Sequence, residues 1–121
     1  MAPVLMSPRS PENFFNALAG ATVTDTKSSG YAVPKRENQA DGTRTAVWEI
    51  MYATGVPTAA DFQLQGAMTD TEAEYTVLDE TTAVVSEART VQIGAWRWLR
   101  VRQVSRTQNT ETSVTVRVTI S

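Results

Sequence analysis

The stretch that decides the fold is Ser113–Ile120, SVTVRVTI, in which apolar and polar residues alternate without interruption. Successive side chains of a β-strand point to opposite faces, so the three valines and Ile120 share one face and the polar residues share the other. This two-residue period predicts a half-buried strand whose apolar face enters a core.

The same period recurs upstream in shorter segments. Thr45–Tyr52 places Trp48 on its apolar face, and Phe62 and Leu64 alternate with glutamines. Further extended segments are expected at 21–26, 30–34, 75–78 and 82–93, although the last has no clean alternation and its inward face is not assigned. About eight short strands separated by turn residues predict an all-β protein, a jelly-roll-like antiparallel β-sandwich.

The segment 96–104, WRWLRVRQV, is expected to form a strand with two very different faces. Leu99 and Val101 suit the core. The opposite face carries two tryptophans and two arginines, a composition typical of surfaces that become covered. The chain's own N-terminal segment, a sister subunit or a sugar could supply that cover, and the sequence leaves the choice open. The residues of this face are Trp96, Trp98, Arg100 and Arg102.

The N-terminal residues lack the alternating pattern. Residues 1–9 contain Pro3 and Pro8 and are expected to form an extended arm. Ser10 can cap a helix, and Gly20 suits its end. The sequence therefore predicts residues 1–20 as an arm with one short helix, followed by a sandwich domain over 21–121.

Three apolar residues of that helix need a docking surface, because so short a helix is not stable alone. Phe14 and Leu18 are four residues apart, on one helical face, and Phe15 is beside them. They are expected to dock on the sandwich or on a neighbouring subunit.

Composition excludes several functions. The chain has 121 residues, a formal net charge of −2, and neither cysteine nor histidine. Disulfides, thiolate or histidine catalysis and zinc sites are therefore excluded. We expect no enzyme activity, no cofactor, no nucleic acid and no membrane contact. The N-terminus is a poor secretion signal, which favours synthesis in a cytoplasm.

The acidic residues leave two minor alternatives. Asp70, Glu72 and Glu74 alternate in a polar segment. A carboxylate pair could act in catalysis, and carboxylates could bind calcium. A solvated loop is the favoured interpretation, and no metal site is predicted.

Four motifs carry a family resemblance: LQGA at 64–67 followed by Asp70, YTVL at 75–78, RWLRV at 97–101 and VTVRVTI at 114–120. With these motifs the chain resembles small structural proteins of tailed bacteriophages and discoidin-like, galactose-binding-like jelly rolls. Ala67 and Thr71 depart from the pattern, which usually has serine and glycine there. The resemblance implies a virion component without catalytic residues.

The expected function is that of a structural virion protein, assembled in the host cytoplasm, that decorates and cements a bacteriophage capsid. Its expected partners are the major capsid protein or other virion proteins and further copies of itself, with a homotrimer favoured. The alternatives are a tail or neck accessory protein, and a carbohydrate-binding module that uses Trp96, Trp98 or Tyr75. The interface candidates are Phe14, Phe15, Leu18, Trp96, Trp98, Arg100 and Arg102.

Overall fold

The computed structural model describes residues 14–20, 23–34 and 44–120. In these ranges it contains nine strands and a single 3-10 turn, η4 (Glu72–Glu74). The strands are β1 (Phe14–Gly20), β2 (Thr26–Lys27), β3 (Tyr31–Ala32), β4 (Thr45–Ala53), β5 (Ala59–Ala67), β6 (Thr76–Thr81), β7 (Glu87–Gln92), β8 (Trp98–Thr107) and β9 (Ser113–Ile120).

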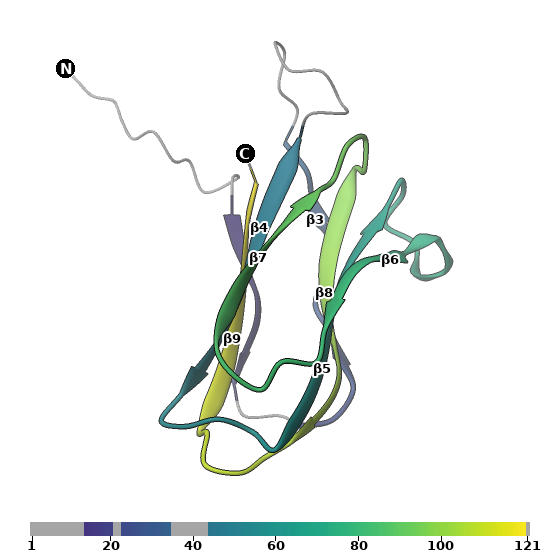
Figure 1. Ribbon diagram of the computed structural model, residues 1–121. Coiled ribbons are helices and arrows are strands. Elements are labelled where there is room, and N and C mark those ends of the chain that lie inside the picture. The colour runs from purple at the N-terminus through teal and green to yellow at the C-terminus, as the bar shows by residue number, and fades with distance from the viewer. Residues whose placement is uncertain (1–13, 21–22, 35–43, 121) are drawn as a thin grey trace, which may run out of the picture.

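The strands form two antiparallel sheets that face each other (Figure 1). One is four-stranded, in the order β1-β9-β4-β7; the other has the order β2-β8-β5-β6, with β3 also paired to β8. The predicted all-β sandwich is therefore confirmed. The sheets share one core between them, as expected for a single domain of this size.

The alternation in β9 is confirmed residue by residue. Val114, Val116, Val118 and Ile120 are all at most 3% exposed, and the residues between them are half-buried. Trp48 of β4, in one sheet, and Phe62 of β5, in the other, are both fully buried in the core between the sheets. The apolar faces predicted from the two-residue period are thus the faces that meet in the core.

From Trp98 onward the two faces of β8 are also as predicted. Leu99 and Val101 are fully buried in the core. Gln103 follows them on the same face and is 2% exposed. Its amide nitrogen donates a hydrogen bond of 2.8 Å to the carbonyl oxygen of Thr24, so this polar group enters the interior with a partner.

The predicted short helix is wrong. Phe14–Gly20 is strand β1, which pairs antiparallel with β9 at the edge of the four-stranded sheet. Phe14 lies opposite Thr119, Phe15 opposite Val118 and Leu18 opposite Val116.

The pairing of β1 with β9 contains a β-bulge. The register shifts between Asn16 and Leu18, so Phe15 and Leu18, three residues apart, both lie opposite buried valines of β9. The four-residue spacing of Phe14 and Leu18 suggested one helical face, but Phe14 lies opposite Thr119 and Leu18 opposite Val116. The extended arm and Ser10 lie outside the described residues.

One end of the sandwich is closed by a buried ion pair. A guanidinium nitrogen of Arg106, Nη1, lies 2.6 Å from Oε2 of Glu111, and both side chains are fully buried. Arg106 Nε donates to Gln103 Oε1 at 3.0 Å, and the backbone N–H of Asn109 donates to Glu111 Oε1 at 2.9 Å. The turn between β8 and β9 is therefore fixed to the core by charge as well as by its backbone.

Candidate functional site

The tryptophan and arginine face of β8 is the outer face of the five-stranded sheet, and its arginines already have partners within the chain. Arg100 is only 7% exposed although it points away from the core. Its Nη1 and Nη2 donate to the two carboxylate oxygens of Glu72 at 2.8 and 3.0 Å, and its Nε donates to Gln65 at 2.6 Å. The guanidinium carbon also lies 4.0 Å from the centre of the Tyr75 ring.

The cover over Arg100 is therefore η4 and Tyr75, from the connection between β5 and β6. This element was not among the covers considered from the sequence. Hydrogen bonding to Arg100 lowers the pKa of Glu72 to about 2, with Lys27 contributing further. A bidentate guanidinium–carboxylate pair with an aromatic ring beside it has a specific geometry, so these contacts fix the position of η4 on the sheet.

A second contact fixes Tyr75. Its hydroxyl donates a hydrogen bond of 2.7 Å to Asp70 Oδ1. Burial and this hydrogen bond raise the pKa of the Tyr75 hydroxyl. Gly30, between β2 and β3, fits closely against the pair, since a Cβ on Gly30 would lie 2.3 Å from both Asp70 Oδ1 and the Tyr75 hydroxyl.

Arg102 is held separately by Asp25. Its Nε and Nη2 donate to the two carboxylate oxygens at 3.0 and 2.7 Å. This hydrogen bonding lowers the pKa of Asp25. Both arginines predicted as interface candidates thus bind acidic residues of their own chain.

The two tryptophans keep part of their surface. Trp96 and Trp98 are half-buried. Trp96 precedes β8 and lies over Gly66, where a Cβ would lie 3.1 Å from the indole Cγ. Because Gly66 pairs with the core residue Leu99, this contact is on the core side of the sheet, so Trp96 does not share the outer face predicted for it. Trp98 lies in the sheet between Ala67 of β5 and Ala32 of β3.

A chain of side-chain amides crosses the same outer face. Gln65 accepts from Arg100 and donates to Gln63 at 2.8 Å, and Gln63 donates to Glu80 at 3.3 Å. At its end Asp61 lies beside Glu80, and its Oδ1 is buried without a hydrogen-bond partner. Burial, followed by hydrogen bonding with Glu80, raises the pKa of Asp61 to about 6, so the Asp61 carboxyl already binds a proton in mildly acidic solution.

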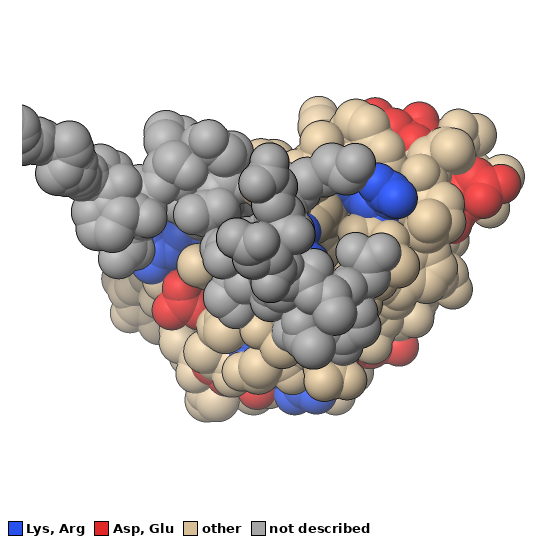
Figure 2. All heavy atoms as spheres, turned by 90° about the horizontal axis from the view of Figure 1, so that it is seen from above, with Lys and Arg blue, Asp and Glu red and all other residues tan. Residues whose placement is uncertain are grey.

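Three acidic residues lie on the connection between β5 and β6. Asp70, Glu72 and Glu74 are all exposed at the residue level. Figure 2 shows acidic side chains at the right-hand end, on the side where Figure 1 places the connection between β5 and β6. Two of these acids have the structural contacts described above, with Tyr75 and Arg100.

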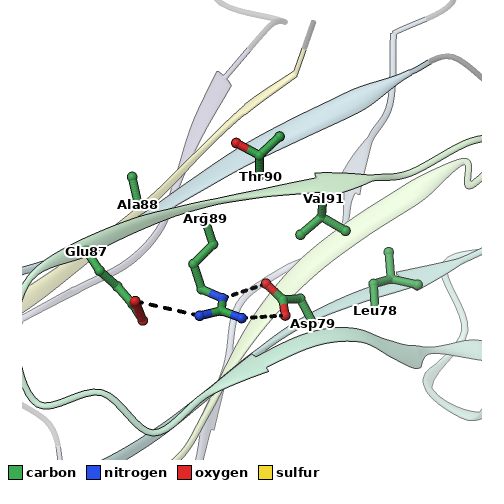
Figure 3. A pocket seen from close by; sticks show the side chains of 7 residues that line it. All are labelled: Leu78, Asp79, Glu87, Ala88, Arg89, Thr90 and Val91. Atoms are coloured by element: carbon green, nitrogen blue, oxygen red, sulfur yellow. Dashed lines mark hydrogen bonds and ion pairs between the residues drawn. The ribbon is translucent and has the colours of Figure 1, made fainter.

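An open groove of about 460 Å³ lies between the adjacent edges of the two sheets, β6 and β7. Figure 3 shows Arg89 of β7 reaching across it to Asp79 of β6. Arg89 Nε and Nη2 donate to Asp79 at 2.7 and 3.1 Å, and the indole N–H of Trp48 donates to the same carboxylate at 3.0 Å. Burial raises the pKa of Asp79, but the hydrogen bonds from Arg89 and Trp48 together lower it by more, so the pKa lies below its usual value.

In this groove an ion pair joins the edges of the two sheets. Asp79 and Arg89 bind each other, and Glu87 makes a second contact with Arg89 at 3.6 Å. The alternation of β7 explains why its inward face was not assigned: the inward positions include the charged residues Glu87 and Arg89 as well as Val91.

The sequence matches no known protein family and no curated protein. Within the described residues no helix is long and apolar enough to cross a membrane.

Solved structures with a similar fold do exist. The SPBc2 prophage-derived protein YomS is 14% identical, with a TM-score of 0.60 over 89% of this chain and 91% of that one. Two cleaved adhesin domains of Lys-gingipain, from Porphyromonas gingivalis in the second case, are 12% and 9% identical, each with a TM-score of 0.52. They are matched over 88% and 89% of this chain and over 70% and 99% of their own. These likenesses show a shared β-sandwich fold.

Proposed function

We propose that this protein is a structural component of a tailed-bacteriophage particle, and that it decorates and cements the capsid. The observation that carries the proposal is the likeness of its fold to a prophage-derived protein over nine-tenths of both chains, 89% and 91%. The sequence resemblance to small virion proteins supports the same class.

The described side chains suit a structural role. On the outer face of the five-stranded sheet, Arg100 and Arg102 are each bound by two hydrogen bonds to a carboxylate of the same chain. In the groove, Arg89 and Asp79 are bound to each other. Networks of this kind stabilise one arrangement of loops and sheets, which is what a rigid building block needs.

The proposed mechanism places the N-terminal arm on the major capsid protein or another virion protein, while the sandwich contacts further copies. An arm that becomes ordered on binding loses conformational entropy, and the buried interface offsets that loss. Because residues 14–20 pair with β9 as β1, the arm in this proposal is residues 1–13.

The test is therefore a deletion of residues 1–13 that keeps β1. We expect the truncated protein to keep its unfolding midpoint and to lose binding to expanded capsids in a co-sedimentation assay. A matched variant that keeps the arm but carries Val77→Lys, at a valine 46% exposed on β6, should bind as the wild type does. Full occupancy by the truncated protein would exclude the arm mechanism.

A tail or neck accessory protein belongs to the same structural class and differs in copy number. Quantitative mass spectrometry of purified particles separates the two. Hundreds of copies per particle are expected for decoration, whereas about six or twelve copies, set by the symmetry of a neck or tail tip, would assign the chain there.

A carbohydrate-binding role in host attachment is the second candidate. It is favoured by the half-buried Trp96 and Trp98, whose indole rings keep some exposed surface, and by the fold likeness to domains named as adhesins. Trp98→Ala should then weaken binding on a glycan array without changing the oligomeric state. Absence of glycan binding by the wild-type protein would exclude this candidate.

A further inference from the structure

The outer face of the four-stranded sheet differs from that of the five-stranded sheet. Val47 on β4 lies in register between Thr119 of β9 and Thr90 of β7. Met51 lies beside Thr115. We call this surface the threonine face; its described residues are Thr45, Val47, Glu49, Met51, Ala88, Thr90, Gln92, Ser113, Thr115, Arg117 and Thr119.

Charge is scarce on the threonine face. Of its residues only Glu49 and Arg117 are charged, and Arg117 Nε donates to Glu49 Oε1 at 3.3 Å. The outer face of the five-stranded sheet, by contrast, carries Asp61, Glu80, Arg100 and Arg102 on its strands. Depletion of charge is typical of the centre of a subunit interface.

The position of the ion pair makes the face complementary to itself. Glu49 and Arg117 are directly opposite each other on β4 and β9, and Ala88 of β7 lies on the other side of Glu49 in the same cross-strand row. A two-fold axis that lies in the plane of contact, runs parallel to β4 and β9 and passes midway between the two charges would bring Glu49 close to Arg117 of the partner subunit. The same operation repeats the contact, because a two-fold interface uses one patch twice.

We propose that the threonine face packs against the same face of a second copy of this chain, in a two-fold dimer. The four charges then alternate in sign at the centre of the contact, and Val47 and Met51 pack around them. Two sheets packed face to face are a standard arrangement of β-proteins, with about 10 Å between the sheets.

The size of the face agrees with a stable contact. Strand spacing and rise give four strands a width of about 19 Å and the nine residues of β4 a length of about 30 Å. Pairing two such faces covers on the order of 1,000 Å² in total, which is where specific interfaces begin.

This dimer is independent of the arm, so its failure would not contradict the capsid proposal. The trimer favoured by the sequence requires a different, three-fold contact. A mass measurement of the full chain in solution distinguishes the two assemblies.

Two opposite charge reversals test the contact. Glu49→Arg leaves only positive charge on the face, and Arg117→Glu leaves only negative charge. Because like charges face each other in each homodimer, we expect each variant alone to dissociate, with a dimer Kd raised about 100-fold. Mixing the two variants should restore a heterodimer in native mass spectrometry.

Circular dichroism of each variant establishes that it folds before the masses are compared. Val47→Lys should also give monomers, whereas Val77→Lys, on the outer face of the other sheet, should leave the dimer unchanged. A wild-type monomer at all accessible concentrations would overturn the proposal. So would folded variants that keep the wild-type oligomeric state, or that fail to form a heterodimer when mixed.

Discussion

Arg106 and Glu111 form an ion pair with no solvent-exposed surface on either side chain, 2.6 Å apart at the closed end of the sandwich. Two charges in an apolar interior are tolerated only when they bind each other and when their remaining polar atoms are also bonded. Gln103 and the backbone of Asn109 supply those further bonds. Removing one member therefore leaves an uncompensated buried charge.

Glu111→Gln should lower the free energy of unfolding by about 3–5 kcal/mol, as for other broken buried pairs. Urea denaturation followed by tryptophan fluorescence measures it. Asp25→Asn, which breaks the exposed pair with Arg102, is the matched control and should lower the free energy of unfolding far less, because solvent screens this pair. Equal effects of the two substitutions would contradict the buried-pair interpretation.

Asp79, in the five-stranded sheet, connects the two sheets. It accepts hydrogen bonds from Trp48 and Arg89, which both belong to the four-stranded sheet. Asp79→Asn should destabilise the fold by about 1–2 kcal/mol at neutral pH. A double-mutant cycle with Trp48→Phe should show a coupling energy, because both substitutions remove the same hydrogen bond. Strict additivity would show that this hydrogen bond contributes nothing.

The pH dependence of the contact between Asp79 and Arg89 follows from the lowered pKa of Asp79. A carboxyl whose pKa is lower in the folded state stabilises the fold above its unfolded pKa of 3.8, and the stabilisation is lost as the pH falls through the folded value. Below pH 3.8 the wild type should therefore lose stability, and the difference between wild type and Asp79→Asn should shrink. Denaturation at two acidic pH values and at pH 7 measures this difference.

Asp61 should behave in the opposite way. Its pKa is raised to about 6 by burial and by Glu80, so the folded state binds a proton that the unfolded state releases at a lower pH. The stabilisation is complete below pH 3.8 and is lost as the pH rises to about 6. Asp61→Asn should thus raise the unfolding midpoint at pH 7.5 and leave it nearly unchanged at pH 4. A lower midpoint at pH 7.5 would contradict the assignment.

Gly30→Ala should release the cover over Arg100. The added Cβ would lie 2.3 Å from Asp70 Oδ1 and from the Tyr75 hydroxyl, so these two side chains must separate. We expect faster hydrogen exchange in η4, with only about 1 kcal/mol lost in global stability. Gly66→Ala is the control, since its Cβ would meet Leu78 and Trp96 and should change tryptophan fluorescence instead.

The sequence predicted the elements whose inward residues are uniformly apolar. β9 and β4 alternate cleanly, and the faces of β8 were correct because Leu99 and Val101 mark the core side. β7 could not be assigned a face, because Arg89 occupies an inward position. The ion pair with Asp79 of β6 explains why a charged residue can occupy this inward position. The local sequence pattern does not show which strands are neighbours, so this partner could not be predicted.

The partners of the arginines were unpredictable for the same reason. Asp70 and Glu72 were visible as a polar loop, but nothing in their spacing indicates that the loop folds onto Arg100. The helix prediction was wrong because capping residues and the four-residue spacing of Phe14 and Leu18 are local signals, whereas the β-bulge and the pairing with β9 depend on a distant strand.

The pairing of β1 with β9 also has a consequence for folding order. These are the first and last strands of the described chain, and β2 and β3 likewise pair with β8. Such topologies have a high contact order and fold slowly, since long loops must close before their contacts form. During synthesis β1 has no native partner until β9 has been made, so we expect a nascent chain stalled before residue 113 to remain sensitive to protease.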